Sequence, residues 1–267
     1  MDKADSFGRH PLQPSLAIAD TLAQARRSGH KLAAPPEPTP ATLPDAYALQ
    51  ALVTRALGWK PRGFKVGATS VTAQAMLGID QPFSASLFEE RLFGSGDRVP
   101  TSAESLRVVE PEVSFVLRDG LPPRAEPYAL REVLAAVESV HPALEVADPR
   151  LPNGLAQPLP WLIADGGIND AFVLGAGVAP LAADEYALFQ VRAQHNGAWV
   201  TSGSGANALG SPAAVLTWLA HHLPTLGLEL RAGDIVTTGL LTGVIMCQPG
   251  DHVMADFAAL GCVSARF

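Results

Sequence analysis

Apolar residues recur at helical spacing through residues 1–60 of the chain. One predicted helix begins at Pro14-Ser15 and ends before Gly29, a residue that readily closes a helix in the left-handed conformation. A proline-rich connector follows, and a second helix is then predicted up to Gly58. Its apolar face consists of Leu49, Leu52, Val53 and Ala56. The pattern therefore predicts an N-terminal helical region over residues 1–60.

After Arg62 the pattern changes to short runs of β-branched and aromatic residues, which are typical of strands. These runs are FKVGA (64–68), EVSFVL (112–117), AFVLG (171–175), LFQVRA (188–193), AWVTSG (198–203), DIVTTG (234–239), GVIMC (243–247) and CVSARF (262–267). Asn196-Gly197 predicts a hairpin turn. Helices are predicted only over about 127–139 and from Ser211-Pro212 onward. Clustered strands with few helices predict an α+β fold over residues 61–267.

The run VVEPEVSFVL (108–117) carries two carboxylates in an otherwise apolar strand. Residues i and i+2 of a strand point to the same side, so Glu110, Glu112 and Ser114 share one polar face. Carboxylates about 7 Å apart repel each other and raise each other's pKa. A bound Mg²⁺ or Mn²⁺ would remove this penalty, because both ions prefer oxygen ligands. The alternative is a solvent-exposed edge strand, marked as an edge by Pro111.

Two further charged residues lie in apolar surroundings. Glu145, in the run HPALEVAD, is either on an exposed face or a third ligand for the same ion. Lys65, in GFKVGATS, is either a functional residue or an edge lysine that prevents aggregation. The glycine-rich segment GSGANALGSP (203–212) lacks the lysine of a phosphate-binding loop, and no GxSxG serine motif is present.

Composition narrows the class of protein. Of 267 residues, 48% are hydrophobic and 17% are charged, which indicates a globular chain with a sizeable core. A net charge of −7 argues against nucleic acid and anionic membranes as partners. No run approaches the roughly 18 apolar residues of a membrane span, and the polar N-terminus does not resemble a secretory signal. Cys247 and Cys262 form neither a disulfide framework nor a zinc pattern, so a cytoplasmic protein is expected.

Several motifs in a fixed order resemble one protein family. The series KVGATS, VEPEVSFVL, PALEVAD, ALGSP, GDIVTTGLLTG and VSARF is similar to the 2-keto-4-pentenoate hydratase and 4-oxalocrotonate decarboxylase group of the fumarylacetoacetate hydrolase superfamily. The resemblance implies a mixed β-roll or barrel-like core, a homo-oligomer, and Mg²⁺ or Mn²⁺ held by Glu110, Glu112 and Glu145. The substrate-binding residues that it implies are Lys65, Ser86, Leu87, Asp165, Thr238 and Gly239.

Two segments depart from the pattern of this group. Phe83 stands where the group usually carries an acid, and residues 164–168 read ADGGI where the group tends to read ADNAS. Both segments are expected near the tail of the substrate. The departures leave the proton-relay residue open and point to an atypical substrate.

The resemblance implies a lyase of catabolic pathways for aromatic compounds. The expected reaction is addition of water to a 2-hydroxydienoate or 2-oxo-enoate, with Lys65 and Glu145 as catalytic residues. Lys65 would hold the anionic head group or stabilise the enolate, and the general base is either Glu145 or a hydroxide on the metal. A 2-oxo acid decarboxylase, a C–C bond hydrolase and a non-catalytic binder of 2-oxo acids remain as alternatives.

Overall fold

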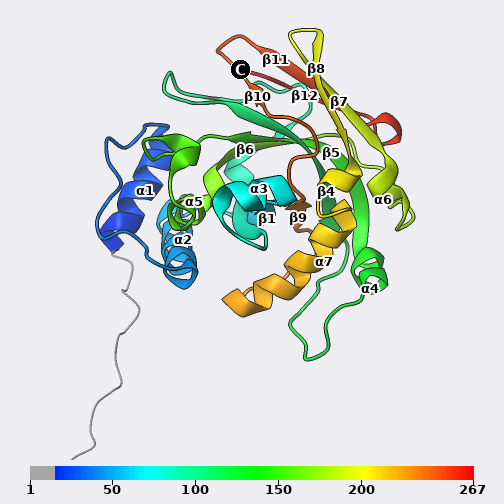
Figure 1. Ribbon diagram of the computed structural model, residues 1–267, viewed down its shortest axis with the longest axis horizontal. Coiled ribbons are helices and arrows are strands. Elements are labelled where there is room, and N and C mark those ends of the chain that lie inside the picture. The colour runs from blue at the N-terminus through cyan, green and yellow to red at the C-terminus, as the bar shows by residue number, and fades with distance from the viewer. Residues whose placement is uncertain (1–15) are drawn as a thin grey trace, which may run out of the picture.

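The computed structural model describes residues 16–267, which form two β-sheets with helices around them (Figure 1). The larger, 8-stranded sheet has the order β2-β1-β9-β4-β5-β6-β3, with β10 paired to β4, and the 4-stranded sheet has the order β12-β11-β7-β8. The strands of the larger sheet are β1 (Pro61–Gly67), β2 (Phe83–Phe88), β3 (Leu92–Gly94), β4 (Val108–Leu117), β5 (Val137–Ala147), β6 (Asn169–Leu174), β9 (Ile235–Thr237) and β10 (Ile245–Met246). The smaller sheet contains β7 (Gln190–His195), β8 (Ala198–Ser204), β11 (His252–Asp256) and β12 (Cys262–Arg266).

The helices are short and lie around these sheets. They are α1 (Leu16–Ser28), α2 (Leu43–Leu57), α3 (Val71–Leu77), α4 (Leu130–Ala135), α5 (Leu159–Ala164), α6 (Glu185–Leu188) and α7 (Pro212–His222). Within residues 16–267, none of them has the length and apolar character that a membrane span needs. The predicted α+β class with N-terminal helices is confirmed.

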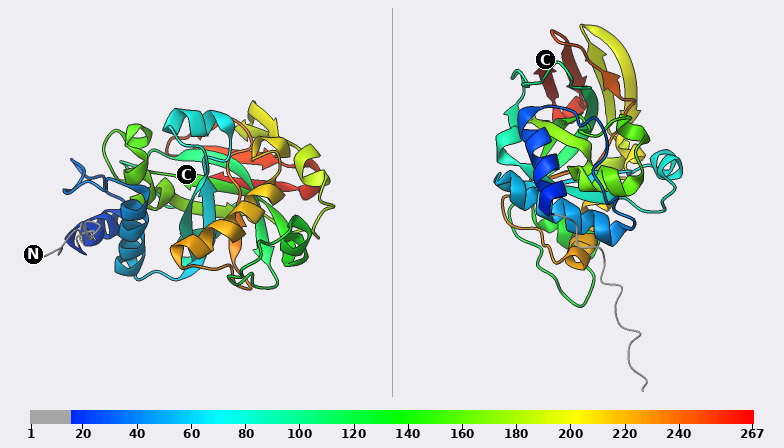
Figure 2. Two further views of the ribbon diagram at one scale, coloured as in Figure 1. Left: turned by 60° about the horizontal axis from the view of Figure 1, so that its bottom comes forward. Right: turned by 90° about the vertical axis from the view of Figure 1, so that its left-hand side faces the viewer.

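The N-terminal helices α1 and α2 pack together at one end of the molecule, beside α5 (Figure 2). Thr42 caps α2 in a box with Asp45, and Gly58 ends the helix with φ 66° as predicted. Leu22 and Leu49 share one buried cluster with Trp161, so the two helices complete their core with residues from much later in the chain. The predicted start of α1 at Pro14-Ser15 lies outside the described residues.

Buried ion pairs attach α1 to the segments that follow β5. Arg26 of α1 lies 3.4 Å from Asp165, and both side chains are almost fully buried. Arg150, also buried, pairs with Asp148 at 2.9 Å and with Asp170. A buried charge is tolerated only when it is paired, so Arg26 holds α1 against the end of α5, and Arg150 holds the segment after β5 against β6.

Strand β4 lies inside the larger sheet rather than at its edge. It pairs antiparallel with β5 along its whole length, and with β9 and β10 as its other neighbours. Val109, Val113 and Phe115 are fully buried in the main core. The alternative of a solvent-exposed edge strand at Pro111 is therefore wrong.

The turn and helix predictions had mixed outcomes. Asn196 and Gly197 have φ 51° and 84° and join β7 to β8, as expected of a two-residue hairpin turn. Ser211 caps α7, also as expected. The helix predicted over 127–139 is wrong at its end, because β5 begins at Val137, which pairs with Leu117 of β4. Sheet pairing here overrides helical periodicity.

Candidate active site

The three glutamates singled out in the sequence lie together on one face of the larger sheet. Glu110 of β4 and Glu145 of β5 are direct partners across the two strands. Glu112 lies two residues beyond Glu110 and so points to the same face. One carboxylate oxygen of each residue lies within 4.8 Å of those of the other two.

Each of the two buried glutamates is oriented through one of its oxygens. Oε2 of Glu112 accepts hydrogen bonds from the Gly239 backbone N–H at 2.9 Å and from the Thr237 hydroxyl. Oε1 of Glu145 accepts one from Asn169 Nδ2 at 3.0 Å. Among residues 16–267, the remaining oxygens, Glu112 Oε1 and Glu145 Oε2, have no hydrogen-bond partner. Unpaired buried carboxylate oxygens are costly, which makes the three glutamates a candidate site for a cation.

The charges at this site support the same conclusion. Burial raises the pKa of Glu110 to about 7, and the charge of Glu145 adds to this effect. Burial, together with the charges of Glu145 and Glu110, also raises the pKa of Glu112 well above its usual value. Three carboxylates with two unpaired oxygens fit a hard divalent cation such as Mg²⁺ or Mn²⁺.

Lys65 lies beside the glutamates. Its Nζ is 3.2 Å from Glu145 Oε1 and donates a hydrogen bond to the Gly167 carbonyl at 3.1 Å. Burial alone lowers the pKa of Lys65, but the charges of Glu145, Glu110 and Glu112 raise it by more, so the lysine stays protonated. Strand β1 lies between β2 and β9, and the Lys65 side chain is buried. The alternative of an edge lysine is therefore wrong.

A cavity of about 570 Å³ opens onto this cluster and is lined by Lys65, Glu110 and Gly239 among others. A larger cavity, of about 870 Å³, lies between α2 and residues 79–83, and none of the three glutamates lines it. Phe83 lines both cavities. The smaller cavity, which we call the glutamate cavity, is the candidate active site because both Lys65 and Glu110 face it.

Thr238 and Gly239, both in GDIVTTG, were expected to bind the substrate. Within the described residues, Gly239 lines the glutamate cavity and Thr238 does not. A Cβ atom at Gly239 would lie 2.0 Å from Thr69 Oγ1, and the φ of 89° favours glycine. Thr238 is fully buried and donates a hydrogen bond to the Val113 carbonyl at 2.8 Å, which holds the end of β9 against β4.

Three other expected substrate-binding residues lie away from the glutamate cavity. Leu87 is buried in a cluster with Phe172 and Ile235, and Ser86 lines the larger cavity. Asp165 pairs with Arg26 and accepts a hydrogen bond from the Arg150 backbone N–H at 2.7 Å. Leu87 therefore packs in the core and Asp165 forms an ion pair, and none of the three residues lines the glutamate cavity.

Three residues that orient the site had no role assigned from the sequence, although one of them, Gly167, lies in the segment 164–168 that was expected near the substrate. Thr237 and Asn169 donate hydrogen bonds to Glu112 and Glu145, and the Gly167 carbonyl receives Lys65. Thr237 could have been found only through the motif GDIVTTG, in which it directly precedes the expected residues Thr238 and Gly239. Asn169 carries no comparable local signal.

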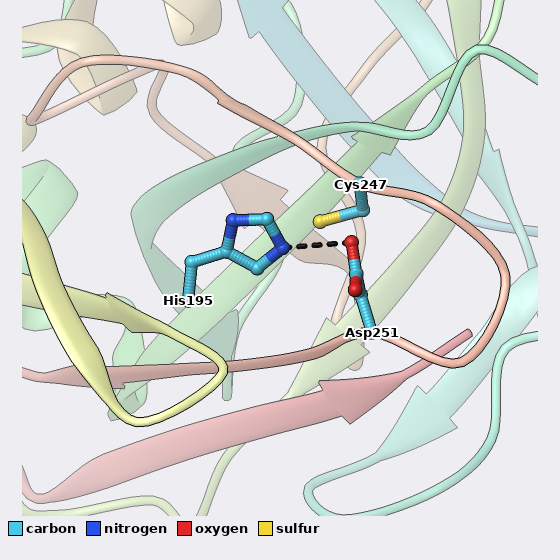
Figure 3. A group of neighbouring side chains, drawn as sticks. All are labelled: His195, Cys247 and Asp251. Atoms are coloured by element: carbon cyan, nitrogen blue, oxygen red, sulfur yellow. Dashed lines mark hydrogen bonds and ion pairs between the residues drawn. The ribbon is translucent and has the colours of Figure 1, made fainter.

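A second group of possible metal ligands lies elsewhere, at the smaller sheet. His195, Cys247 and Asp251 point toward one another (Figure 3). Both oxygens of Asp251 already have partners: His195 at 2.7 Å, Asn196 Nδ2 at 2.8 Å and the Gln248 backbone N–H at 2.7 Å. Burial, and then the charge of Asp251, raise the pKa of the Cys247 thiol to about 12. This group therefore braces a turn, and the glutamates are the stronger candidate for a metal.

Known proteins match the chain over most of its length. Residues 70–267 match the family described as fumarylacetoacetate (FAA) hydrolase C-terminal. A 2-keto-4-pentenoate hydratase of Paraburkholderia xenovorans (strain LB400) is 34% identical over 254 residues, which cover 93% of each chain. A 4-oxalocrotonate decarboxylase of Pseudomonas sp. (strain CF600) is 32% identical and covers 94% of this chain and 96% of its own.

Structural comparison agrees with these matches. A structure of 4-oxalocrotonate decarboxylase from Pseudomonas putida G7, complexed with magnesium and adipate, superimposes with a TM-score of 0.85 at 29% identity, covering 99% of this chain and 100% of the other. The family's mixed fold, expected from the sequence motifs, is confirmed. The chain therefore belongs to the fumarylacetoacetate hydrolase family, in its 2-keto-4-pentenoate hydratase and 4-oxalocrotonate decarboxylase group.

Proposed function

We propose that this protein is a hydratase that depends on a divalent metal and adds water to a 2-hydroxydienoate or its 2-oxo-enoate form. The observation that carries the proposal is the pair of unpaired, buried oxygens on Glu112 and Glu145, directly beside a buried, protonated lysine. Similarity to 2-keto-4-pentenoate hydratases supports addition of water as the reaction.

Glu110, Glu112 and Glu145 would hold Mg²⁺ or Mn²⁺ at this site. When bound, the ion supplies Lewis-acid polarisation of the substrate's carboxylate and 2-oxygen. The hydrogen bonds of Gly239 to Glu112 and of Asn169 to Glu145 keep the two carboxylates in fixed orientations. Such support of the ligands typically strengthens metal binding.

Lys65 would bind the anionic head group of the substrate or the 2-oxygen on which negative charge develops. Its Nζ is held by the Gly167 carbonyl and Glu145, so the charge needs little reorganisation during the reaction. A fixed positive charge in a buried site stabilises such a transition state strongly.

We assign the general base to Glu145. Its Oε2 would be committed to the metal, so Oε1, which lies 3.2 Å from Lys65 Nζ, would accept the proton from the water that adds to the far end of the conjugated system. Phe83, at the position where an acid is expected, has no group that could take this role.

Decarboxylation of a 2-oxo acid is a second candidate, favoured by the close similarity in fold to the Pseudomonas putida G7 decarboxylase. The same head-group site would serve both reactions, because each develops negative charge on the 2-oxygen. C–C bond hydrolysis and binding without turnover are the further alternatives. A homo-oligomer remains a prediction, which light scattering on the purified protein would test.

The test is turnover of 2-hydroxypenta-2,4-dienoate by the full chain with Mg²⁺, followed by loss of the dienol absorbance and by product analysis. We expect a hydrated 2-oxo acid as the product, and loss of turnover after chelation that Mg²⁺ or Mn²⁺ restores. Release of CO₂ from 4-oxalocrotonate, without hydration of the dienoate, would favour the decarboxylase. Turnover that survives complete removal of divalent metal would contradict the proposal.

A further inference from the structure

Apart from Lys65 and Glu110, the glutamate cavity is lined by large apolar side chains and by uncharged polar ones, the latter being Thr69, Ser70, Thr72, Asn207 and Thr242. Its interior includes three buried residues: Phe83, Leu162 and Ile168. Its rim includes large apolar side chains that are exposed to solvent: Met76, Leu155 and Val244, with exposed fractions of 83%, 52% and 48%. Exposed apolar side chains gathered at the mouth of a cavity often mark a binding surface.

Positive charge in the glutamate cavity is confined to the head-group end. Of the described residues that line it, Lys65 is the only one with a cationic side chain, and its Nζ already contacts Glu145 and the Gly167 carbonyl. A second carboxylate at the far end of a substrate would lose part of its water and would meet only uncharged polar groups there, with no cationic partner. Burial of an unpaired carboxylate is strongly unfavourable.

Phe83 closes one side of the glutamate cavity with carbon atoms. Its ring centroid lies 5.4 Å from Lys65 Nζ. The ring also contacts β1 at Gly67, where an added Cβ atom would lie only 2.5 Å from the ring. This close packing leaves no room for a side chain at Gly67.

The size of the cavity suggests a tail longer than that of a five-carbon dienoate. Its volume of about 570 Å³ lies within the range of roughly 300–1,000 Å³ that is usual for pockets of drug-sized ligands. A substrate with an alkyl or aryl tail would use this volume and cover the apolar rim.

We infer that the substrate is a monocarboxylic 2-hydroxydienoate with an apolar alkyl or aryl group at its far end, and that substrates ending in a second carboxylate are disfavoured. The inference rests on the proposed function, because it assumes that the head group binds at Lys65 and the glutamates. It separates this protein from the similar decarboxylase whose structure holds adipate, a dicarboxylate.

Calorimetric titration of the full chain, loaded with Mg²⁺, tests the inference with three unreactive probes. Pyruvate carries only the head group. The compounds 6-methyl-2-oxoheptanoate and 2-oxoadipate share the same head group and chain, and differ in an isopropyl group or a carboxylate of similar size at the end. We expect 6-methyl-2-oxoheptanoate to bind at least ten times more tightly than 2-oxoadipate.

Two matched variants locate the tail. Met76 lines the rim, whereas Val71 lies on the same helix, α3, is equally exposed at 82%, and does not line the glutamate cavity. Met76→Arg should tighten binding of 2-oxoadipate several-fold, and Val71→Arg should leave it unchanged. Equal effects of the two arginines would overturn the assignment of the tail to this rim.

The outcomes separate the two proposals. If pyruvate binds in a Mg²⁺-dependent way but 2-oxoadipate binds as tightly as 6-methyl-2-oxoheptanoate, the inference about the tail is wrong and the proposed function stands. If none of the three probes shows Mg²⁺-dependent binding, the head-group site fails, and both proposals fail with it.

Discussion

Glu110 and Glu145 face each other directly across β4 and β5, so two carboxylates form a cross-strand pair inside the larger sheet. Like charges in directly opposed positions destabilise a sheet. Glu112, two residues from Glu110, adds a third carboxylate to the same face. The fold therefore accepts an unfavourable arrangement of charge, which a divalent cation would relieve.

Removing one charge from this group should separate metal binding from folding. Glu112→Gln keeps the volume and the hydrogen-bond acceptor for Gly239 but removes the charge. We expect the metal-free variant to melt no lower than the metal-free wild type, because repulsion is reduced. Its gain in melting temperature on adding Mg²⁺ should be much smaller, because a ligand is lost. A gain equal to that of the wild type would exclude Glu112 as a ligand.

The metal-free protein should lose stability as the pH rises from about 4.5 to about 7. Glu110 has a pKa of about 7 in the folded protein instead of 4.5. Within this range the folded protein holds a proton that the unfolded chain has released, so each rise in pH favours unfolding. Thermal melts at several pH values would measure the slope.

Two controls accompany this pH series. Glu110→Gln should reduce the slope without abolishing it, because the pKa of Glu112 is raised as well. Saturating Mg²⁺ should also reduce the slope, because it favours the ionised carboxylates. Asp251, with a pKa lowered to about 2 by hydrogen bonds from Asn196, Gln248 and His195, titrates below this range. A metal-free melting temperature that rises from pH 4.5 to 7 would contradict the prediction.

Lys65→Met should reduce kcat by about 10²–10³-fold, which is typical for loss of one group that stabilises developing charge. Methionine keeps much of the apolar volume of the lysine stem, so the fold should survive. Lys60→Met is the control, since Lys60 is exposed and pairs with Glu89 at the surface. Steady-state kinetics on a 2-hydroxydienoate measure both variants, and a fall of less than threefold for Lys65→Met would remove this residue from catalysis.

Arg26→Met should lower the free energy of unfolding by about 3–5 kcal/mol, because it leaves Asp165 buried without its partner. The control is Arg192→Met, which breaks the pair of Arg192 and Asp256 on an exposed part of the smaller sheet. Such surface pairs contribute at most about 1 kcal/mol. Urea denaturation measures the free energy of unfolding of both variants. Equal losses would show that burial of the Arg26 pair adds nothing to stability.

The part of the site that lies within one strand could be predicted from the sequence. The alternation of β4 places Glu110 and Glu112 on one face without knowledge of any partner strand. The alignment of Glu145 with Glu110 depends on the register of β5 against β4, which no local pattern reports. The family resemblance supplied this residue where physical reasoning from the sequence left two alternatives.

The ion pair of Asp165 with Arg26 could not be predicted from the sequence. An acid beside two glycines has the composition of a functional loop, and its partner Arg26 is 139 positions earlier in the chain. No periodicity or spacing connects two residues so far apart. Similarly, Val137 reads as the end of an amphipathic helix until its pairing with Leu117 is known.

The contact of Arg26 with Asp165 also has a consequence for shortened versions of the protein. An added Cβ at Gly166 would lie 2.9 Å from the Arg26 guanidinium, so α1 packs directly on this turn. The carbonyl of the next residue, Gly167, accepts the hydrogen bond from Lys65. A protein that begins at β1 would retain every residue described as lining the glutamate cavity. It would nevertheless lose the support of that turn, and with it the fixed position of the lysine.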